Sequence, residues 1–249
     1  MYGETEMKKI LKCIMLIITL VIAGFLLLVM IGFFGGDDTK NSDNVYFYEP
    51  EKKKQYVPSD ILNPGVLKVD EENIPDKEYS DTLELAMKNP DIDISPEDDY
   101  MRNMDKIIKE FKSDRYIAVY FISEKGETEA ATTFAKFKIK EIDGKEKYVF
   151  LTKVSSKSTK DAKSGIKTSK GIALQLGLSD ALQDLNVNPG NRFVYGVVPD
   201  DSVYSLKVEG QEPDEIVHFT MLGKDYYLWY YLNLNSDYSG DTLSYEIKE

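Results

Sequence analysis

One apolar run near the N-terminus constrains this chain more than any other feature. The run extends from Ile10 to Phe34 and is interrupted only by Lys12 and Thr19. As a helix rising about 1.5 Å per residue it reaches about 37 Å, enough to cross a hydrocarbon core of about 30 Å. A cleaved signal peptide has an apolar region of only about 7 to 15 residues and a small-residue cleavage site, which residues 33–37 lack. We therefore expect an uncleaved transmembrane helix over residues 10–34.

The charges that flank this run predict its orientation. Lysines precede it at positions 8 and 9, and Asp37 and Asp38 follow it. Because cationic flanks stay on the cytoplasmic side, residues 1–9 are expected to be a cytoplasmic tail and the rest of the chain to be extracytoplasmic. The single cysteine, Cys13, lies within the run, so no disulfide is expected outside the membrane. The predicted location is the cell membrane, in a single-pass arrangement.

Charge is distributed unevenly along the expected extracytoplasmic part. Residues 37–114 hold 21 acidic and 11 basic side chains, whereas residues 136–170 hold 11 lysines and 4 acids. Residues 171–249 are acidic again, with 13 acids and 4 basic residues. The net charge of the whole chain is −12. Because phosphate binding needs a dominant basic face, this balance argues against nucleic acid as a partner.

The first expected extracytoplasmic segment has the composition of a stalk. Six of the nine prolines lie between residues 35 and 96, where sustained apolar periodicity is absent. We expect an acidic, proline-containing stalk over residues 35–94. Within it, residues 45–48 and 65–69 are candidate short strands, and residues 80–88 are a candidate helix ended by Asn89-Pro90.

Residues 95–249 are predicted to form an α+β domain. Ser95 and Pro96 have the pattern of a helix start, and an apolar stripe to Phe111 predicts an amphipathic helix that covers a sheet. A short helix is expected over residues 179–185. Antiparallel meanders are expected from strands at 115–122, 132–142, 147–154, 192–198, 203–209, 215–222, 225–234 and 242–247, with a hairpin turn at Asp143-Gly144. An alternative is two cystatin-like subdomains divided near residues 156–171.

The architecture resembles that of uncharacterised single-span extracytoplasmic proteins of Gram-positive bacteria. The resemblance is carried by the Met7-Lys8-Lys9-Ile10 start, the single apolar span, the acidic stalk and the strand pair of Val194 to Val198 followed by Val203, Leu206 and Val208. The use of 28 lysines against 3 arginines also fits a low-GC genome. This resemblance implies location and no particular chemistry.

Two sets of residues are candidate binding sites. In residues 153–170, lysines recur at helical spacing among serines, threonines and glycines. A helix formed on binding would present these lysines on one face to lipid headgroups or an anionic envelope polymer. They are Lys157, Lys160, Lys163, Lys167 and Lys170. A solvated connecting loop explains the same residues.

The predicted strand at residues 225–234 is rich in aromatic residues and is the second candidate. Its Tyr227, Trp229 and Tyr231 side chains share one face that could stack on a sugar or a partner protein, unless that face is core.

A calcium loop is a further candidate near the C-terminus. Asn235, Asp237, Ser239, Gly240 and Glu246 occupy positions 1, 3, 5, 6 and 12 of the D-x-[DN]-x-[DN]-G-x5-E pattern. The flanking segments are predicted strands, whereas the loop normally joins two helices. A plain hairpin loop explains the same polar residues, so no cofactor is expected and calcium is kept as an alternative.

Enzymatic signatures are weak. Ser164 and Lys167 match the S-x-x-K pattern, but inside a polar loop and not at the head of a buried helix. The only histidine, His218, alternates with apolar residues in a predicted strand. Asp200 and Asp201 follow a proline, where carboxylates commonly accept backbone hydrogen bonds. The sequence therefore predicts a membrane-anchored binding or interaction module at the cell surface without catalysis, with a surface hydrolase as the alternative.

Overall fold

The computed structural model describes residues 45–48, 71–89, 92, 94–162 and 167–248. Contacts divide the chain into two compact units, Met1–Lys40 and Asn41–Glu249, and every described residue belongs to the second. The expected span at residues 10–34, the cytoplasmic tail and the candidate strand at residues 65–69 lie outside the described residues. Within the described residues, no helix has the length and apolar character needed to cross a membrane.

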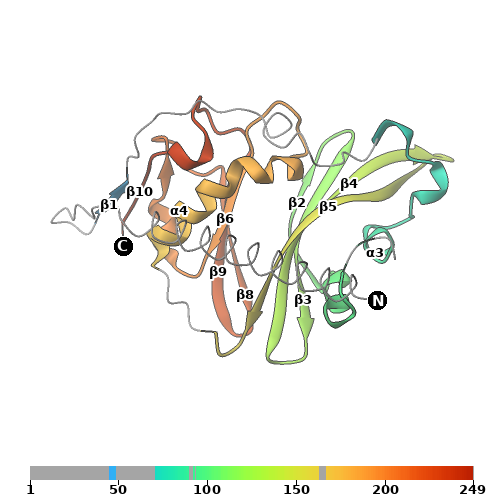
Figure 1. The fold of residues 1–249 in the computed structure, drawn as a ribbon, viewed down its shortest axis with the longest axis horizontal. Coiled ribbons are helices and arrows are strands. Elements are labelled where there is room, and N and C mark those ends of the chain that lie inside the picture. Colours follow the sequence, from blue (N-terminus) through green and yellow to red (C-terminus); the bar gives the residue numbers. More distant parts are fainter. Residues whose placement is uncertain (1–44, 49–70, 90–91, 93, 163–166, 249) are drawn as a thin grey trace, which may run out of the picture. The chain divides into compact units, whose positions relative to one another are not determined.

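The second unit is an α+β fold built on three antiparallel sheets (Figure 1). The largest has the strand order β2-β3-β4-β5, the next has the order β6-β9-β8, and the smallest has the order β1-β10-β7. Their bounds are Val45–Tyr48 for β1, Lys106–Lys112 for β2, Tyr116–Lys125 for β3, Glu129–Ile142 for β4, Lys145–Thr159 for β5, Val194–Val198 for β6, Lys207–Val208 for β7, Glu215–Met221 for β8, Lys224–Tyr231 for β9 and Tyr245–Lys248 for β10. The predicted fold class is confirmed for these residues.

Short helices connect and cover the sheets. The α-helices are α3 (Leu83–Met87) and α4 (Thr168–Leu178), and the 3-10 helices are η1 (Glu71–Asn73), η2 (Asp76–Glu78), η3 (Pro96–Arg102), η4 (Ser179–Leu185), η5 (Asp201–Ser205) and η6 (Gly240–Thr242). The helix expected near residues 80–88 is confirmed as α3, which the Thr82 side chain caps by accepting a hydrogen bond from the Leu85 N–H.

Strand β3 is the centre of the largest sheet. It pairs with β2 on one side and with β4 on the other, and all residues from Tyr116 to Ser123 are buried. Tyr120 faces the space between the two larger sheets, while Phe121 faces the outer layer that contains α3. The prediction of a central strand buried on both faces is therefore confirmed, and the hairpin at Asp143-Gly144 is confirmed by positive φ angles of 54° and 72°.

The amphipathic helix predicted from Ser95 to Phe111 is wrong. The helical part ends at Arg102 as η3, and the rest forms strand β2, which is hydrogen-bonded along the edge of β3. Adjacent β-branched residues, Ile107 and Ile108, favour an extended backbone, and a register shift between Ile107 and Lys109 accommodates the irregular apolar spacing. The largest sheet therefore has β2 as its fourth strand, where the sequence pattern predicted a helix covering the sheet.

Three apolar clusters hold the layers together. The first lies between the two larger sheets and contains Phe111, Tyr120 and Phe134 from one sheet with Tyr195 and Phe219 from the other. The second packs α4, η5 and the smallest sheet against the opposite face of β6 and β9. The third packs α3 and Ile92 against the outer face of β3 and β4. Because the first cluster joins residues from both halves of the chain, residues 95–249 do not form two separate cores.

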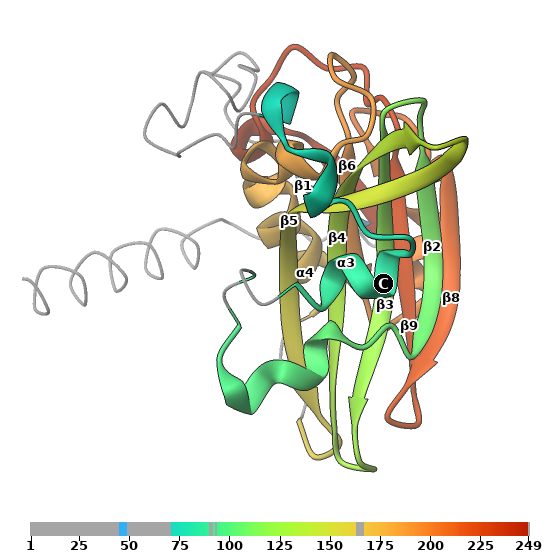
Figure 2. The ribbon, with the colours of Figure 1, turned by 90° about the vertical axis from the view of Figure 1, so that its right-hand side faces the viewer.

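Part of the segment expected to be a stalk belongs to this packing. In α3, Met87 is 0% exposed. The Arg102 guanidinium donates hydrogen bonds to the carbonyl groups of Met87 (3.2 Å), Asn89 (2.7 Å) and Ile92 (2.7 Å). Strand β1, which the sequence also indicated, pairs with β10. The described residues between 71 and 94 therefore form a cover on the four-stranded sheet, as Figure 2 shows for α3 beside β3 and β4.

Two further predictions need correction. Residues 203–209 are predicted to be a strand, but η5 covers residues 203–205 and β7 has only two residues, because Asp200 caps a helical turn by accepting a bond from the Ser202 N–H. The connecting loop expected within residues 153–170 is replaced at its ends by β5, which continues to Thr159, and by α4, which begins at Thr168. Pairing of Ser155 to Thr159 with β4 explains the longer strand.

Candidate functional site

The two larger sheets meet along one side and separate along the other. Strands β2 and β8 lie together, where the Lys109 ammonium and the Glu215 carboxylate are 2.5 Å apart. On the opposite side, the edge strands β5 and β6 border a cavity of about 280 Å³, which residues of α4 and η4 also line. We call this cavity the β5–β6 cleft. It is near the lower end of the size range of small-ligand sites, about 300 to 1,000 Å³.

The β5–β6 cleft is lined by hydroxyl-bearing and apolar side chains, without a charged one among the described lining residues. The hydroxyl and amide groups come from Tyr120, Thr132, Ser156, Ser158, Gln175, Tyr195 and Tyr226. The apolar and backbone contributions come from Val154, Ser155, Leu178, Leu182, Gly196, Val197, Pro199, Phe219 and Met221. Such a lining offers hydrogen bonds to a ligand without a counter-charge, so it favours an uncharged ligand.

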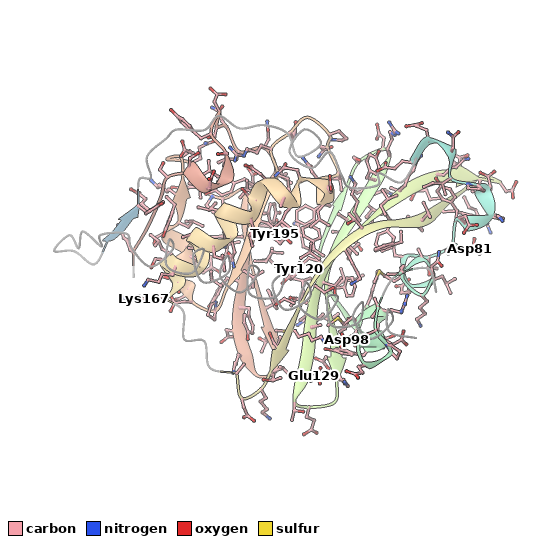
Figure 3. The ribbon with its side chains drawn as sticks, in the orientation of Figure 1. Asp81, Asp98, Tyr120, Glu129, Lys167 and Tyr195 are labelled. Atoms are coloured by element: carbon pink, nitrogen blue, oxygen red, sulfur yellow. The ribbon has the colours of Figure 1, made fainter. Side chains whose placement is uncertain are left out.

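Two buried phenols lie at the floor of the cleft. Figure 3 shows Tyr120 of β3 and Tyr195 of β6 between the two larger sheets, and their exposed fractions are 4% and 9%. Burial raises the pKa of both phenols, with the Thr132 hydrogen bond opposing the shift at Tyr120. Both groups therefore remain neutral at physiological pH and can donate a hydrogen bond.

The period of the strands explains how these side chains reach the cleft. Opposite residues on paired strands face the same side of a sheet, and Ser156 pairs with Thr132 while Val154 pairs with Phe134. Val154, Ser156 and Ser158 therefore point toward the first apolar cluster, and the intervening Ser155 and Lys157 point to the outer face. Val154 and Leu178 are 42% and 50% exposed, so the rim of the cleft is apolar.

Glutamine side chains cap the edge of β6. The Gln175 amide of α4 donates to the Val197 carbonyl at 2.6 Å. The Gln183 amide donates to the Phe193 carbonyl at 2.6 Å and accepts from the Phe193 N–H at 3.2 Å. This capping depends on Gly196, because a Cβ there would lie 2.0 Å from the Gln175 Oε1 atom and 2.4 Å from the Trp229 ring.

The lysine-rich strands are largely engaged by the acidic cover. On this side of the sheet, basic and acidic groups pair at Arg115–Glu72 (2.6 Å), Lys140–Asp76 (2.6 Å), Lys147–Asp81 (3.1 Å) and Lys157–Asp98 (2.5 Å). The Lys138 ammonium also donates to the Glu71 carbonyl. The uneven charge of the sequence thus reflects contacts inside the fold.

The structure does not bring the four described candidate lysines onto one helical face. Lys157 is in β5 and is paired with Asp98, and Lys160 follows the strand, where its N–H donates to the Thr128 carbonyl. Lys167 and Lys170 lie at the start of α4, and Figure 3 shows Lys167 far from Asp98. Lys163 lies outside the described residues. The four described lysines do not share a helical face in this structure, because they belong to different elements. Binding through the lysines of this segment stays a prediction.

The aromatic strand is core on both faces. Trp229 and Tyr231 are 0% and 3% exposed beneath α4 and η5, so a ligand cannot stack on them. Leu228 and Tyr230 are buried on the opposite face. Of the three candidate residues, only Tyr227 is partly exposed, and its ring lies 5.6 Å from that of Tyr204. The binding face predicted for this strand is corrected to a core face.

The candidate calcium ligands have internal partners or belong to regular structure. The Asn235 carbonyl accepts from the Gln211 amide at 3.0 Å, and the Ser239 hydroxyl donates to the Asp241 carboxylate at 2.6 Å. Glu246 lies in β10 between β1 and β7, and Asp237 is exposed. Among the described residues, no group of three or more histidine, cysteine and acidic side chains is placed to hold a metal ion. Calcium binding stays a prediction.

His218 is a surface residue of the β8–β9 hairpin. Its Nε2 atom is 2.8 Å from the Asp225 carboxylate, and Thr220 donates to the same carboxylate at 3.2 Å. The His218 hydrogen bond holds the pKa of Asp225 below its usual value. Ser164, the other residue of the hydrolase alternative, lies outside the described residues. A hydrogen-bonded histidine–carboxylate pair at an exposed hairpin is by itself a structural contact, because covalent catalysis also needs a nucleophile within hydrogen-bond reach of the histidine.

Sequence reasoning missed the residues that line the β5–β6 cleft. The predicted strand ends at Val154, and Ser156 and Ser158 fall in the lysine-rich segment that is predicted to bind as a helix or to be a connecting loop. Tyr120 and Tyr195 looked like core residues, and nothing local indicated that their sheets separate beside them. Comparison with known proteins finds no matching family model, no matching curated protein and no matching solved structure.

Proposed function

We propose that this chain is a membrane-anchored binding module of the cell surface and that the β5–β6 cleft holds an uncharged ligand. The observation that supports the ligand site is the absence of charged side chains among its described lining residues, in a chain in which 30% of residues are charged. Its hydroxyl groups can orient a ligand, and its apolar rim can shield one from water.

The chemistry of the lining also narrows the partner. An anionic envelope polymer would require free cationic groups, whereas the Lys157 ammonium is bound to Asp98 and the cleft itself supplies no cation. Another surface protein, or a neutral small molecule, fits this lining better. We therefore favour binding of a neutral group over the surface-hydrolase alternative, for which the described residues show only the exposed His218–Asp225 pair.

A pair of dyes tests the ligand site. N-phenyl-1-naphthylamine is neutral, and 1-anilinonaphthalene-8-sulfonate has the same ring system with a negative charge. We expect the full-length chain, in mild detergent with a detergent blank, to bind the neutral dye at least tenfold more tightly. Equal binding of the two dyes, or stronger binding of the anionic one, would contradict a cleft selective for neutral groups.

A matched pair of variants tests where the neutral dye binds. Ser156→Phe places a ring in the β5–β6 cleft, whereas Thr159→Phe places the same ring on the same strand at an exposed position outside the lining. Ser156→Phe should abolish binding of the neutral dye, and Thr159→Phe should leave it unchanged. Equal dye binding by both variants would place the binding site elsewhere.

The membrane part of the proposal rests on the sequence of residues 10–34 and its flanking lysines. It is tested by cysteine labelling. In a Cys13→Ala background, Tyr204→Cys puts a thiol at a position that is 62% exposed. A membrane-impermeant maleimide should label this thiol in intact cells that express the chain. Labelling only after the cells are lysed would contradict an extracytoplasmic domain.

A further inference from the structure

The two edge strands that border the β5–β6 cleft are protected to different extents. Beside β6, the Gln175 side chain bonds to the Val197 carbonyl, and the Gln183 side chain bonds to the N–H and the carbonyl of Phe193, which directly precedes the strand. The first half of β5 is capped too, because the N–H and the carbonyl of Tyr148 bond to Ser80 at 2.9 and 2.8 Å. In the second half of β5, the backbone N–H and carbonyl groups of Ser155 and Lys157 form no hydrogen bond with any described residue outside the sheet.

The direction of these backbone groups follows from the ladder. The Lys160 N–H donates to the Thr128 carbonyl of the neighbouring strand. Backbone groups alternate in direction along an antiparallel strand, and the register from Thr152 to Thr159 is unbroken. The N–H and carbonyl groups of Ser155 and Lys157 are therefore directed away from β4, toward the open side of the cleft.

We propose that the ligand of the cleft is an extended peptide segment of another protein, which adds to β5 as a fifth strand of the large sheet. This inference rests on the cleft being the binding site. Main-chain hydrogen bonds to Ser155 and Lys157 supply the alignment, as in other cases of strand addition to an exposed sheet edge. A sugar or other small neutral ligand would not use these two aligned donor and acceptor pairs.

The surroundings of the edge define the guest sequence. Guest residues opposite Val154 and Ser156 face the cleft, where the rim offers exposed apolar surface from Val154 and Leu178. The alternate guest residues face outward beside Lys157, whose ammonium is already paired with Asp98. The favoured guest therefore alternates apolar residues with uncharged polar ones.

The test uses an acetylated eight-residue peptide in which valine alternates with glutamine, measured by fluorescence anisotropy with the full-length chain in mild detergent. Binding should protect the amides of residues 155 and 157 from hydrogen exchange. A peptide that alternates valine with glutamate should not bind more tightly, because the Lys157 ammonium is occupied by Asp98. Absence of binding by the valine–glutamine peptide, or protection confined to other segments, would overturn the proposal.

Two variants at one position separate the backbone from the side chain. Ser155→Pro removes an outward N–H at an edge position that tolerates proline, whereas Ser155→Ala removes only the hydroxyl, which contacts Thr133. Ser155→Pro should weaken peptide binding about tenfold, as expected for one lost hydrogen bond, and Ser155→Ala should change it less than twofold. Equal effects of the two variants would overturn strand addition.

Peptide chemistry gives a test that does not depend on folding of a variant. Methylation of the backbone amides of all valines, or in a second peptide of all glutamines, blocks one or the other edge of the guest strand. At least one of the two peptides should lose binding, and retention by both would overturn the proposal. If the neutral dye still binds and Ser156→Phe still blocks it, the cleft remains a ligand site of another kind. The oligomeric state of the chain is measured by sedimentation. If the chain is a dimer and Ser155→Pro dissociates it, the edge of β5 pairs with a second copy of this chain and not with another protein.

Discussion

The two faces of the four-stranded sheet differ in how they use charge. Its outer face is covered by an acidic segment that is held by ion pairs and by the buried guanidinium of Arg102. Its inner face leads into the β5–β6 cleft, whose described lining is neutral. Both faces belong to strands rich in lysine, so local composition does not distinguish them. The two faces differ because the fold brings acidic groups such as Asp76 and Asp81 to the outer face and no charged group to the described lining of the cleft.

This difference changes how the basic segment of the sequence is interpreted. Eleven lysines between residues 136 and 170 suggested a surface for anionic partners. The structure instead shows several of them bound to acids that lie 40 to 70 residues earlier in the chain, such as Asp76 and Asp81. A charge island in a sequence can therefore complete an internal interface, and its partner is found by searching the sequence for an island of opposite charge.

The largest effect is expected from Arg102→Ala, which removes the polar attachment of the cover. Arg102 is 9% exposed, and its loss leaves three carbonyl groups and the Asp99 carboxylate without their donor. We expect the free energy of unfolding to fall by about 4 kcal/mol, because buried acceptors lose charge-assisted bonds. Denaturant unfolding monitored by circular dichroism measures this change. A loss below about 1 kcal/mol would mean that the cover is not attached through this residue.

A slightly smaller effect is expected from Met87→Ala, which tests the apolar attachment of the same cover. Met87 is 0% exposed, and truncation of a buried methionine typically costs about 3 kcal/mol. Leu85→Ala is the matched control in α3, because Leu85 is 54% exposed and should contribute less than about 0.5 kcal/mol. Similar losses for the two variants would show that α3 does not use the described face for packing.

Gly196→Ala tests the inner side of the comparison. The new methyl group would displace the Gln175 amide and press on the Trp229 ring, so the cap on β6 would be lost. We expect the free energy of unfolding, measured by denaturant unfolding, to fall by about 2 kcal/mol, which is typical of overpacking in a dense site. Gln175→Ala removes the bond to the Val197 carbonyl without adding a methyl group, so it should cost only about 1 kcal/mol. A loss for Gly196→Ala no larger than that for Gln175→Ala would mean that the new methyl group is accommodated without strain.

The sequence predicted the strands better than it predicted what covers them. The runs at residues 115–122, 132–142 and 215–222 have strong β-forming composition, and each became a strand. The stripe from Tyr100 to Phe111 fits a helix by spacing alone, yet Ile107 and Ile108 form a strand because β3 offers an unpaired edge. Tertiary pairing of this kind is not visible in a local window.

The candidate site was less predictable than the fold. A cleft arises where two sheets separate, and that depends on the packing of Tyr120, Phe134, Tyr195 and Phe219, which are distant in sequence. The lysine and aromatic patterns were chosen because each was locally unusual. The fold used Lys157 in an ion pair and Trp229 in the core. Side chains that look functional in a sequence can thus be structural, whereas hydroxyl groups of ordinary appearance can line a site.

The smallest effect concerns acid sensitivity and compares ion pairs on the two sides of the sheet. The hydrogen bond from Lys109 lowers the pKa of Glu215, and that from Lys112 lowers the pKa of Glu146, both below the ordinary value of 4.5. A carboxyl group with a lowered folded-state pKa stabilises the fold above its unfolded-state pKa, and this contribution disappears as the pH falls through the folded-state value. We expect the midpoint temperature of unfolding to decline as the pH is lowered from about 5 to 3.

Two variants compare the strength of these ion pairs. Glu215→Gln removes the ion pair between β2 and β8 and should flatten the decline more than Glu146→Gln does. The reason is that the Lys109 side chain is only 28% exposed, whereas both partners of the Lys112–Glu146 pair are 49% exposed and better screened by water. If the two variants flatten the decline equally, the contact that joins the sheets opposite the cleft is no stronger than an ordinary surface pair, and the first apolar cluster alone holds the sheets together there.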